Sequence, residues 1–255
     1  MKLVDVHCHL ESVHFIHDLE GIIDRARSAG IAALITSTIT PDQWALSRGI
    51  AERFTDVEYA MGIHPWYIQK SFMEDIEGLA GAKELGAVAI GEIGIDSKSG
   101  GDLDQQIVFF EKQLAIAREI DLPVVIHCRG AFNELILSLK RTGAPKSGGI
   151  IHSFSGSPEL AEELIRYGLS FSMGGTLTYR NSKKRSAVLK KIYPDHFLLE
   201  TDSPDIPPVQ KQGEINYPHY IRYNLEAAAE ILGDTIENIA ENTTRNAVRI
   251  FKLKI

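Results

Sequence analysis

Two histidines near the start of the chain, His7 and His9, have the types and the spacing of metal ligands. They lie at the end of a run of apolar strand formers that begins at residue 3. Because side chains two apart on a strand project from the same face, both imidazoles can meet one cation. A pair of buried, hydrogen-bonded histidines is the alternative. The rest of the chain must decide between them by supplying further ligands or not.

Five more polar residues follow apolar runs at regular intervals: His64, Glu92, His127, His152 and Asp202. From His9 onward the separations are about 55, 28, 35, 25 and 50 residues, or roughly two, one, one, one and two units of a strand plus a helix. Taken singly, each has an alternative: a turn or core histidine, a surface carboxylate, or a helix cap. Taken together, they fall where successive parallel strands end, which predicts one shared site.

Six of these residues could bind metal, which is too many for a single tetrahedral ion: His7, His9, Glu92, His127, His152 and Asp202. A glutamate can bridge two cations with its two carboxylate oxygens. Mixed imidazole and carboxylate ligands suit Mg²⁺, Mn²⁺ or Zn²⁺, and the absence of cysteine ligands disfavours structural zinc. The sequence therefore predicts two divalent metal cations of open identity.

The elements that must position these residues alternate along the chain. Strands are expected over residues 3–6, 32–36, 57–63, 87–90, 123–126, 149–151, 169–173 and 197–199. Apolar residues at a 3.6-residue period predict helices over 16–29, 104–120, 181–192, 220–232 and 235–250, with further helix starts at Pro41 and Pro158. This alternation predicts a single-domain α/β fold, a (β/α)8 TIM barrel over residues 1–255, with an open doubly wound sheet as the alternative.

The composition is that of an ordinary globular protein, with 44% hydrophobic and 24% charged residues. We expect no membrane span and, without a secretory signal pattern, a cytoplasmic protein. The net charge of −7 argues against nucleic-acid binding through bulk electrostatics, and the basic clusters at 183–185 and 190–191 are expected to be solvated helix faces. Cys8 and Cys128 each follow a candidate ligand and are expected to be small buried residues, although a disulfide stays open.

Six ordered motifs resemble those of the TatD-type metal-dependent deoxyribonucleases, amidohydrolase-like TIM barrels, over essentially the whole chain. They are His7-Cys8-His9-Leu10, Gly62-Ile63-His64-Pro65, Gly91-Glu92-Ile93-Gly94-Ile95-Asp96, Leu122-Pro123-Val124-Val125-Ile126-His127, His152-Ser153-Phe154-Ser155-Gly156 and Glu200-Thr201-Asp202-Ser203-Pro204. The resemblance implies one ion held by His7, His9, Glu92 and Asp202. It implies a second ion held by Glu92, His127 and His152. His64 would contact substrate phosphate, and Asp202 would also transfer a proton.

The chain departs from the family pattern at four places. Glu11 stands where an aspartate is usual, residues 97–101 replace aromatic residues, Gly130 replaces an aspartate, and Ser153 replaces a cysteine. The candidate ligands are untouched, so metal-dependent hydrolysis is still expected. The changes at 97–101 and at Gly130 bear on the choice of substrate.

Residues and resemblance together predict a DNase, acting as a 3′–5′ exonuclease on single-stranded DNA. The expected catalytic residues are Asp202, Glu92 and His64, with a water activated between the cations attacking phosphorus. Asp202 would accept the proton, while His64 and Arg129 would bind the phosphate. DNA would be held through the metals and local contacts, and no obligate protein partner is evident.

Two other functions stay open. A dinuclear-metal esterase or amidohydrolase could use the same residues on a small ester, a lactone or an aminoacyl-tRNA ester. A catalytically silent barrel that serves as a binding partner is the other, and the intact candidate ligands count against it.

Overall fold

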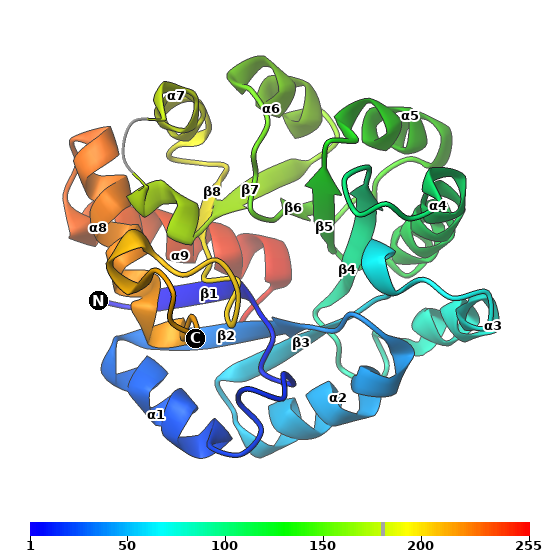
Figure 1. The fold of residues 1–255 in the computed structure, drawn as a ribbon, viewed down its shortest axis with the longest axis horizontal. Coiled ribbons are helices and arrows are strands. Elements are labelled where there is room, and N and C mark those ends of the chain that lie inside the picture. Colours follow the sequence, from blue (N-terminus) through cyan, green and yellow to red (C-terminus); the bar gives the residue numbers. More distant parts are fainter. Residues whose placement is uncertain (180–181) are drawn as a thin grey trace.

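Eight parallel strands pair in chain order in the computed structural model, which describes residues 1–179 and 182–255 (Figure 1). The strands are β1 (Leu3–Cys8), β2 (Ile31–Ser37), β3 (Val57–Met61), β4 (Ala89–Asp96), β5 (Val124–Arg129), β6 (Gly149–Ile151), β7 (Leu169–Met173) and β8 (Phe197–Leu199). Sequential order with a helix after nearly every strand confirms the predicted TIM barrel and excludes the doubly wound sheet.

Helices surround the strands on the outside of the barrel (Figure 1). They are α1 (Leu19–Ser28), α2 (Trp44–Arg53), α3 (Phe72–Asp75), α4 (Leu103–Ile120), α5 (Phe132–Thr142), α6 (Pro158–Ile165), α7 (Lys183–Ile192), α8 (Ile221–Leu232) and α9 (Ile236–Phe251). Pro158 starts α6 as expected, with the Ser157 hydroxyl accepting from the Leu160 N–H at 3.3 Å. Pro41 instead starts a 3₁₀ turn (Pro41–Gln43) that leads into α2. The helix expected over 181–192 begins at Lys183, and Asn181 lies outside the described residues.

The barrel closes between β8 and β1 through hydrogen bonds beyond the end of β8. The Asp202 N–H donates to the His7 carbonyl at 2.9 Å, and the His9 N–H donates to the Ser203 carbonyl at 2.8 Å. Beneath them, the buried Asp5 carboxylate accepts from the Thr201 N–H at 2.9 Å and from its hydroxyl at 2.5 Å. This seam joins the first and last strands and brings Asp202 beside both histidines of β1.

The buried apolar residues form two main layers. The larger layer lies between the strands and the outer helices. The smaller layer fills the barrel interior, where Val4 and Ile35 pack with Ile250 and Phe251 of α9. Filling the amino-terminal half with apolar side chains leaves the carboxyl-terminal half for the polar ones. Within the described part of the chain, no helix is long and apolar enough to cross a membrane.

The expected boundaries of four strands are wrong. β1 was expected over residues 3–6 but runs to Cys8. β4 was expected at 87–90 but runs to Asp96, and β5 was expected to end at residue 126 but runs to Arg129. The reason is that polar residues occur inside these strands where they face the centre, while the ladder continues through the pairs Ile93–Ile126 and Asp96–Arg129. β3 instead ends early, because the Gln113 side chain binds the backbone N–H of Ile63 at 2.8 Å in place of a strand partner.

Candidate metal centre

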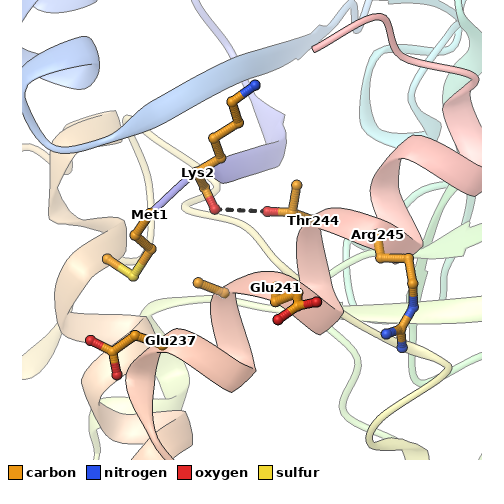
Figure 2. A pocket seen from close by; sticks show the side chains of 7 residues that line it. Met1, Lys2, Glu237, Glu241, Thr244 and Arg245 are labelled. Atoms are coloured by element: carbon orange, nitrogen blue, oxygen red, sulfur yellow. Dashed lines mark hydrogen bonds between the residues drawn. The ribbon is translucent and has the colours of Figure 1, made fainter.

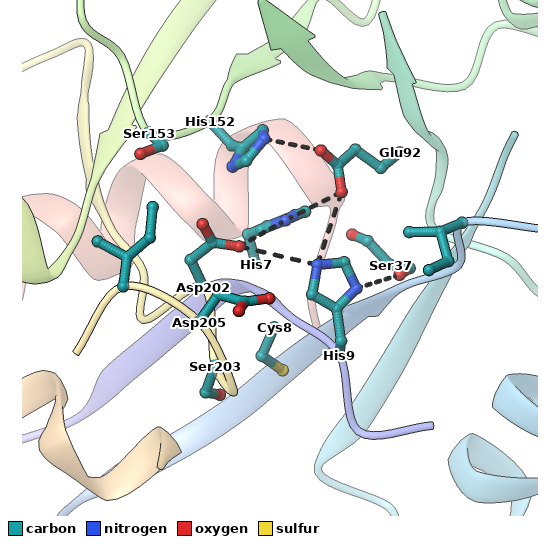
Figure 3. A network of polar contacts seen from close by, with 12 residues as sticks. His7, Cys8, His9, Ser37, Glu92, His152, Ser153, Asp202, Ser203 and Asp205 are labelled. Atoms are coloured by element: carbon teal, nitrogen blue, oxygen red, sulfur yellow. Dashed lines mark hydrogen bonds and ion pairs between the residues drawn. The ribbon is translucent and has the colours of Figure 1, made fainter. Parts of the chain in front are cut away.

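The carboxylate of Glu92, on β4, lies close to five imidazoles, of which Figure 3 shows those of His7, His9 and His152. Its Oε2 is 3.3 Å from His7 Nε2 and 3.6 Å from His9 Nε2. Its Oε1 is 3.2 Å from His127 Nδ1 and 2.8 Å from His152 Nε2. Oε1 also lies 3.2 Å from His64 Nε2. The two carboxylate oxygens therefore face different sets of histidines, the arrangement that a bridging ligand needs.

The first pair is completed by Asp202, which follows β8. Its Oδ1 lies 3.4 Å from His7 Nε2 and 3.7 Å from His9 Nε2. Figure 3 shows the two imidazoles and the carboxylate pointing toward one another from the two sides of the barrel seam. Backbone pairing of β1 with the segment after β8 therefore sets the position of this cluster.

Hydrogen bonds on the far side of two rings fix which nitrogen is free. His9 Nδ1 is 2.8 Å from the Ser37 carbonyl, which can only accept, so Nδ1 carries the proton. His127 Nε2 is 3.0 Å from Asp96 Oδ2, so here Nε2 carries it. The nitrogens that face Glu92, His9 Nε2 and His127 Nδ1, therefore present lone pairs in the neutral rings, as metal ligands must.

His64 has the opposite arrangement. Its Nδ1 accepts the backbone N–H of Trp66 at 3.1 Å, so the neutral ring carries its proton on Nε2. That Nε2 lies 3.2 Å from Glu92 Oε1. Burial lowers the pKa of His64 despite the nearby Glu92 charge, which keeps the ring neutral at physiological pH. His64 therefore presents a hydrogen-bond donor at the site.

The electrostatics of the cluster call for added positive charge. Burial alone would raise the pKa of Glu92, but His64, His152 and His7 hold it well below its usual range. The neighbouring rings of His7 and His9 likewise hold the pKa of Asp202 low against the effect of burial. Burial would lower the pKa of His7, yet Glu92 and Asp202 raise it to about 10.

The negative charges of Glu92 and Asp202 in a buried site therefore favour a proton on His7. A divalent cation at the same place would neutralise these charges more completely. In the part of the chain that the structure describes, both ring nitrogens of His7 and the Nδ1 of His152 have no hydrogen-bond partner. Buried polar atoms without partners are costly unless something binds them. The donor set of imidazole nitrogens and carboxylate oxygens fits divalent metal cations.

The sequence model of the family described as "TatD related DNase" matches residues 4–252 of this chain. The chain belongs to the TatD family. The "Uncharacterized metal-dependent hydrolase YabD" of Bacillus subtilis is 36% identical, over 98% of this chain and 99% of the relative. The crystal structure of YjjV, a TatD homologue from Escherichia coli, is 30% identical with a TM-score of 0.91, over 99% of this chain and 98% of that one. The chain is thus a metal-dependent hydrolase of the TatD family.

The barrel is also shared more widely. A mutant of a PTE-like lactonase from Deinococcus radiodurans superposes with a TM-score of 0.67 at 17% identity, over 98% of this chain and 95% of that one. At this level of identity the likeness shows the fold alone.

Three buried acids that the sequence analysis gave no role support the TatD-type cluster. Asp96 accepts from the His127 ring at 3.0 Å, from the Trp66 indole N–H at 2.6 Å and from the Lys98 N–H at 2.7 Å. These donors hold its pKa below the usual range against burial. A signal was present, because Glu92 and Asp96 lie four residues apart on one strand and so share a face. Asp5, at the seam, and Glu200 are the other two.

Glu200 lies behind His152, at the end of β8. Its carboxylate accepts from the Ser153 N–H at 2.8 Å and from the Ser172 hydroxyl at 2.5 Å, and its Oε2 is 3.9 Å from His152 Nδ1. Burial and the Asp202 charge raise its pKa to about 8, against the opposing effect of His7. Glu200 therefore ties the segment that carries His152 to β7 and β8.

Two of the family departures have a structural account. Glu11 is buried, accepts a hydrogen bond from the Thr36 hydroxyl at 2.5 Å and lies 3.4 Å from His9 Nδ1. It therefore faces the same ring nitrogen of His9 as the Ser37 carbonyl does. At Gly130, whose φ is +69°, a Cβ would lie 2.7 Å from Ser97 Oγ and 2.8 Å from Lys98 Cε. The altered loop after β4 therefore occupies the space that a side chain at 130 would need.

Not every predicted residue reaches the cluster. Arg129 ends β5 with its side chain exposed, and its guanidinium makes no hydrogen bond or ion pair with the residues described. His14 and His17 are exposed, and His196 contacts the Ser170 hydroxyl at 3.2 Å, so these three histidines are not part of the cluster. Cys8 and Cys128 are both buried and free, which leaves no disulfide between them.

A surface hollow lies away from this centre, between the first two residues and α9 (Figure 2). There the Thr244 hydroxyl donates to the Lys2 carbonyl at 2.9 Å. Because Lys2 precedes the amino end of β1, the hollow is on the side of the barrel opposite the metal-binding cluster. We assign it no part in catalysis.

Proposed function

We propose that this TatD-family hydrolase is a DNase that removes nucleotides from single-stranded DNA in the 3′–5′ direction, with two divalent cations. One observation carries the proposal: the histidines around Glu92 divide into those that present lone pairs and one, His64, that presents a donor. Lone pairs suit cations, and a neutral N–H suits the oxygens of a phosphodiester. The description of the matching family as a DNase supports the same substrate.

The cations would be Mg²⁺, Mn²⁺ or Zn²⁺. One would be held by His7, His9 and Asp202, which form one cluster of possible ligands, together with Glu92. The other would be held by His127 and His152, which both lie near Glu92 Oε1. When bound, they supply Lewis-acid activation of water and neutralise charge on the phosphoryl oxygens. They would also attract phosphate locally, which would offset the repulsion between DNA and a protein with a net charge of −7.

The protein's own residues then divide the remaining work. Asp202 is ionised throughout the physiological range and accepts the proton of the attacking water. The His64 Nε2–H donates to a phosphoryl oxygen and orients the substrate. Arg129, exposed at the end of β5, is free to bind phosphate from the solvent side.

Purified protein incubated with Mn²⁺ or Mg²⁺ and end-labelled single-stranded DNA tests this function. A ladder that shortens from the 3′ end, and that is lost in Glu92→Ala, is the expected result. Intact DNA under all metal conditions would refute the proposal. Normal activity of Glu92→Ala or Asp202→Asn would refute the site.

A dinuclear esterase, lactonase or aminoacyl-tRNA hydrolase is the second candidate, because the same cations can polarise a carbonyl. The lactonase that shares the fold supports only the statement that such a barrel can carry this chemistry. A panel of aryl esters and lactones run beside the DNA substrates separates the two functions. An enzyme that hydrolyses only carbonyl esters would not need a side chain, such as His64, that donates a hydrogen bond to phosphate.

A further inference from the structure

Two large aromatic side chains lie open to solvent beside the candidate metal centre. Trp66 and Tyr67 follow His64 in a short 3₁₀ turn (Pro65–Tyr67) between β3 and α3, and they are 51% and 42% exposed. The loop is held close to the centre because both backbone N–H groups bind His64, Trp66 to Nδ1 at 3.1 Å and Tyr67 to the carbonyl at 3.1 Å. An exposed tryptophan leaves apolar surface in water, which a ligand could cover.

The indole of Trp66 is fixed rather than free. Its Nε1–H donates to Asp96 Oδ2 at 2.6 Å, and the ring meets His64 edge-on, with centroids 5.1 Å apart and planes at 90°. It also lies 5.8 Å from the ring of His127. The polar edge of the indole is therefore used inside the protein, while the rest of its surface remains half open. A ring held in this way loses little side-chain entropy when a flat group stacks on it.

Resting on the proposed DNase function, we propose that Trp66, with Tyr67 beside it, forms a stacking subsite for an unpaired nucleobase next to the scissile phosphate. His64, whose Nε2–H would donate a hydrogen bond to the phosphate, packs edge-on against the indole of Trp66. A nucleotide whose phosphate is bound at His64 can therefore stack its base on Trp66. A paired base is already covered by its neighbours in the duplex, which gives the subsite its preference for single strands.

The overall charge of the protein is in keeping with such a subsite. With a net charge of −7, little affinity for DNA can come from neutralising many phosphates. Stacking on an aromatic ring does not depend on charge, tolerates any base, and changes binding by about 5- to 150-fold per base. The subsite would thus supply affinity that the electrostatics of the surface cannot.

The test compares a single-stranded oligonucleotide with two abasic versions of it, in which a tetrahydrofuran residue replaces the last or the second-last nucleotide at the 3′ end. The kcat/KM for each substrate is measured with Mn²⁺ for the wild type, Trp66→Ala, Trp66→Phe and Tyr67→Ala. Leu137→Ala, which removes another half-exposed apolar side chain but from the outer helix α5, is the matched control. The ratio of normal to abasic substrate cancels any general damage done through Asp96.

At one of the two positions, the wild type should prefer the base by about 5- to 150-fold. This ratio should fall toward one in Trp66→Ala, fall partway in Tyr67→Ala, and be largely kept in Trp66→Phe and Leu137→Ala. A wild type that cleaves DNA without such a preference, or a ratio unchanged in Trp66→Ala, would overturn the stacking subsite and leave the DNase function intact.

Binding can be followed separately from cleavage. The chain has two tryptophans, so in Trp44→Phe the emission reports Trp66 alone. Without added metal, single-stranded DNA should quench this emission, and fully abasic strands should not. Quenching without cleavage in the first assay would support the subsite and count against the DNase function, whereas absence of quenching would count against the subsite.

Discussion

Asp96→Asn should weaken one cation site and spare the other. Asp96 accepts a hydrogen bond from the Nε2–H of His127 at 3.0 Å, and the Nδ1 of that ring faces Glu92 Oε1. The replacement keeps the size of the side chain and an oxygen for hydrogen bonding but removes the charge that makes His127 a better donor of electrons. Loss of such a carboxylate partner of a ligating histidine typically costs about 10- to 100-fold in metal affinity.

The effect should be confined by the geometry of the cluster. His7, His9 and Asp202 face the other oxygen of Glu92, and no hydrogen bond or ion pair described in the structure joins them to Asp96. We therefore expect the affinity of the His7–His9–Asp202 site to change by no more than about twofold. One cation should dissociate easily while the other stays bound.

Isothermal titration of chelator-treated protein with Mn²⁺ resolves the two sites. The wild type should show two bound ions, and Asp96→Asn should show one of unchanged affinity and one weakened by about 10- to 100-fold. Asp104→Asn, the same substitution at an exposed position of α4, is the control and should behave as the wild type. Equal weakening of both sites, or no weakening, would refute the role of Asp96 and the division of the ligands by the two oxygens of Glu92.

Four further results are expected. His64→Ala should lower kcat/KM for DNA by about 10- to 150-fold, through loss of one hydrogen bond to a charged group, while two Mn²⁺ ions still bind by titration; loss of an ion would contradict the donor role. Asp202→Asn should lower kcat by about 10²- to 10⁴-fold in steady-state assays, and an unchanged kcat would exclude it as the proton acceptor. Asp5→Ala should reduce the free energy of unfolding in urea by about 2–4 kcal/mol, because Thr201 loses both of its hydrogen bonds to Asp5 at the barrel seam; a variant as stable as the wild type would refute that account. When the free cation is present at 100 times the Kd of a site, removing it with a chelator should lower the melting temperature by about 5–10 °C for each such site, measured by calorimetry. An unchanged melting temperature would mean that no cation is bound.

The barrel and the membership of the polar cluster could be predicted from the sequence because both depend on local patterns. Continuous apolar runs alternating with a 3.6-residue period specify parallel strands and outer helices. Once the strands are placed, topology alone brings residues at their carboxyl ends together. This is why His7, Glu92 and Asp202, which are far apart along the chain, could be assigned to one site before any distance was known.

What could not be predicted depends on contacts that no sequence period encodes. Glu92 and His127 lie inside β4 and β5 rather than after them, because the ladder continues past the apolar run. The roles of Asp96 and Glu200 depend on the groups that each carboxylate binds. These are the His127 ring for Asp96, and the Ser153 N–H and Ser172 hydroxyl for Glu200. The tautomer of His64 depends on a hydrogen bond from the Trp66 backbone N–H in its own loop, which no sequence pattern indicates.

The most direct test of the account is a crystal structure of the protein soaked in Mn²⁺, with anomalous data collected to locate the ions. The account predicts two peaks on either side of the Glu92 carboxylate, about 3.5–4 Å apart. One should lie against His7, His9 and Asp202, and the other against His127 and His152, with His64 free of both. A single peak, or a peak coordinated by His64 Nε2, would contradict it.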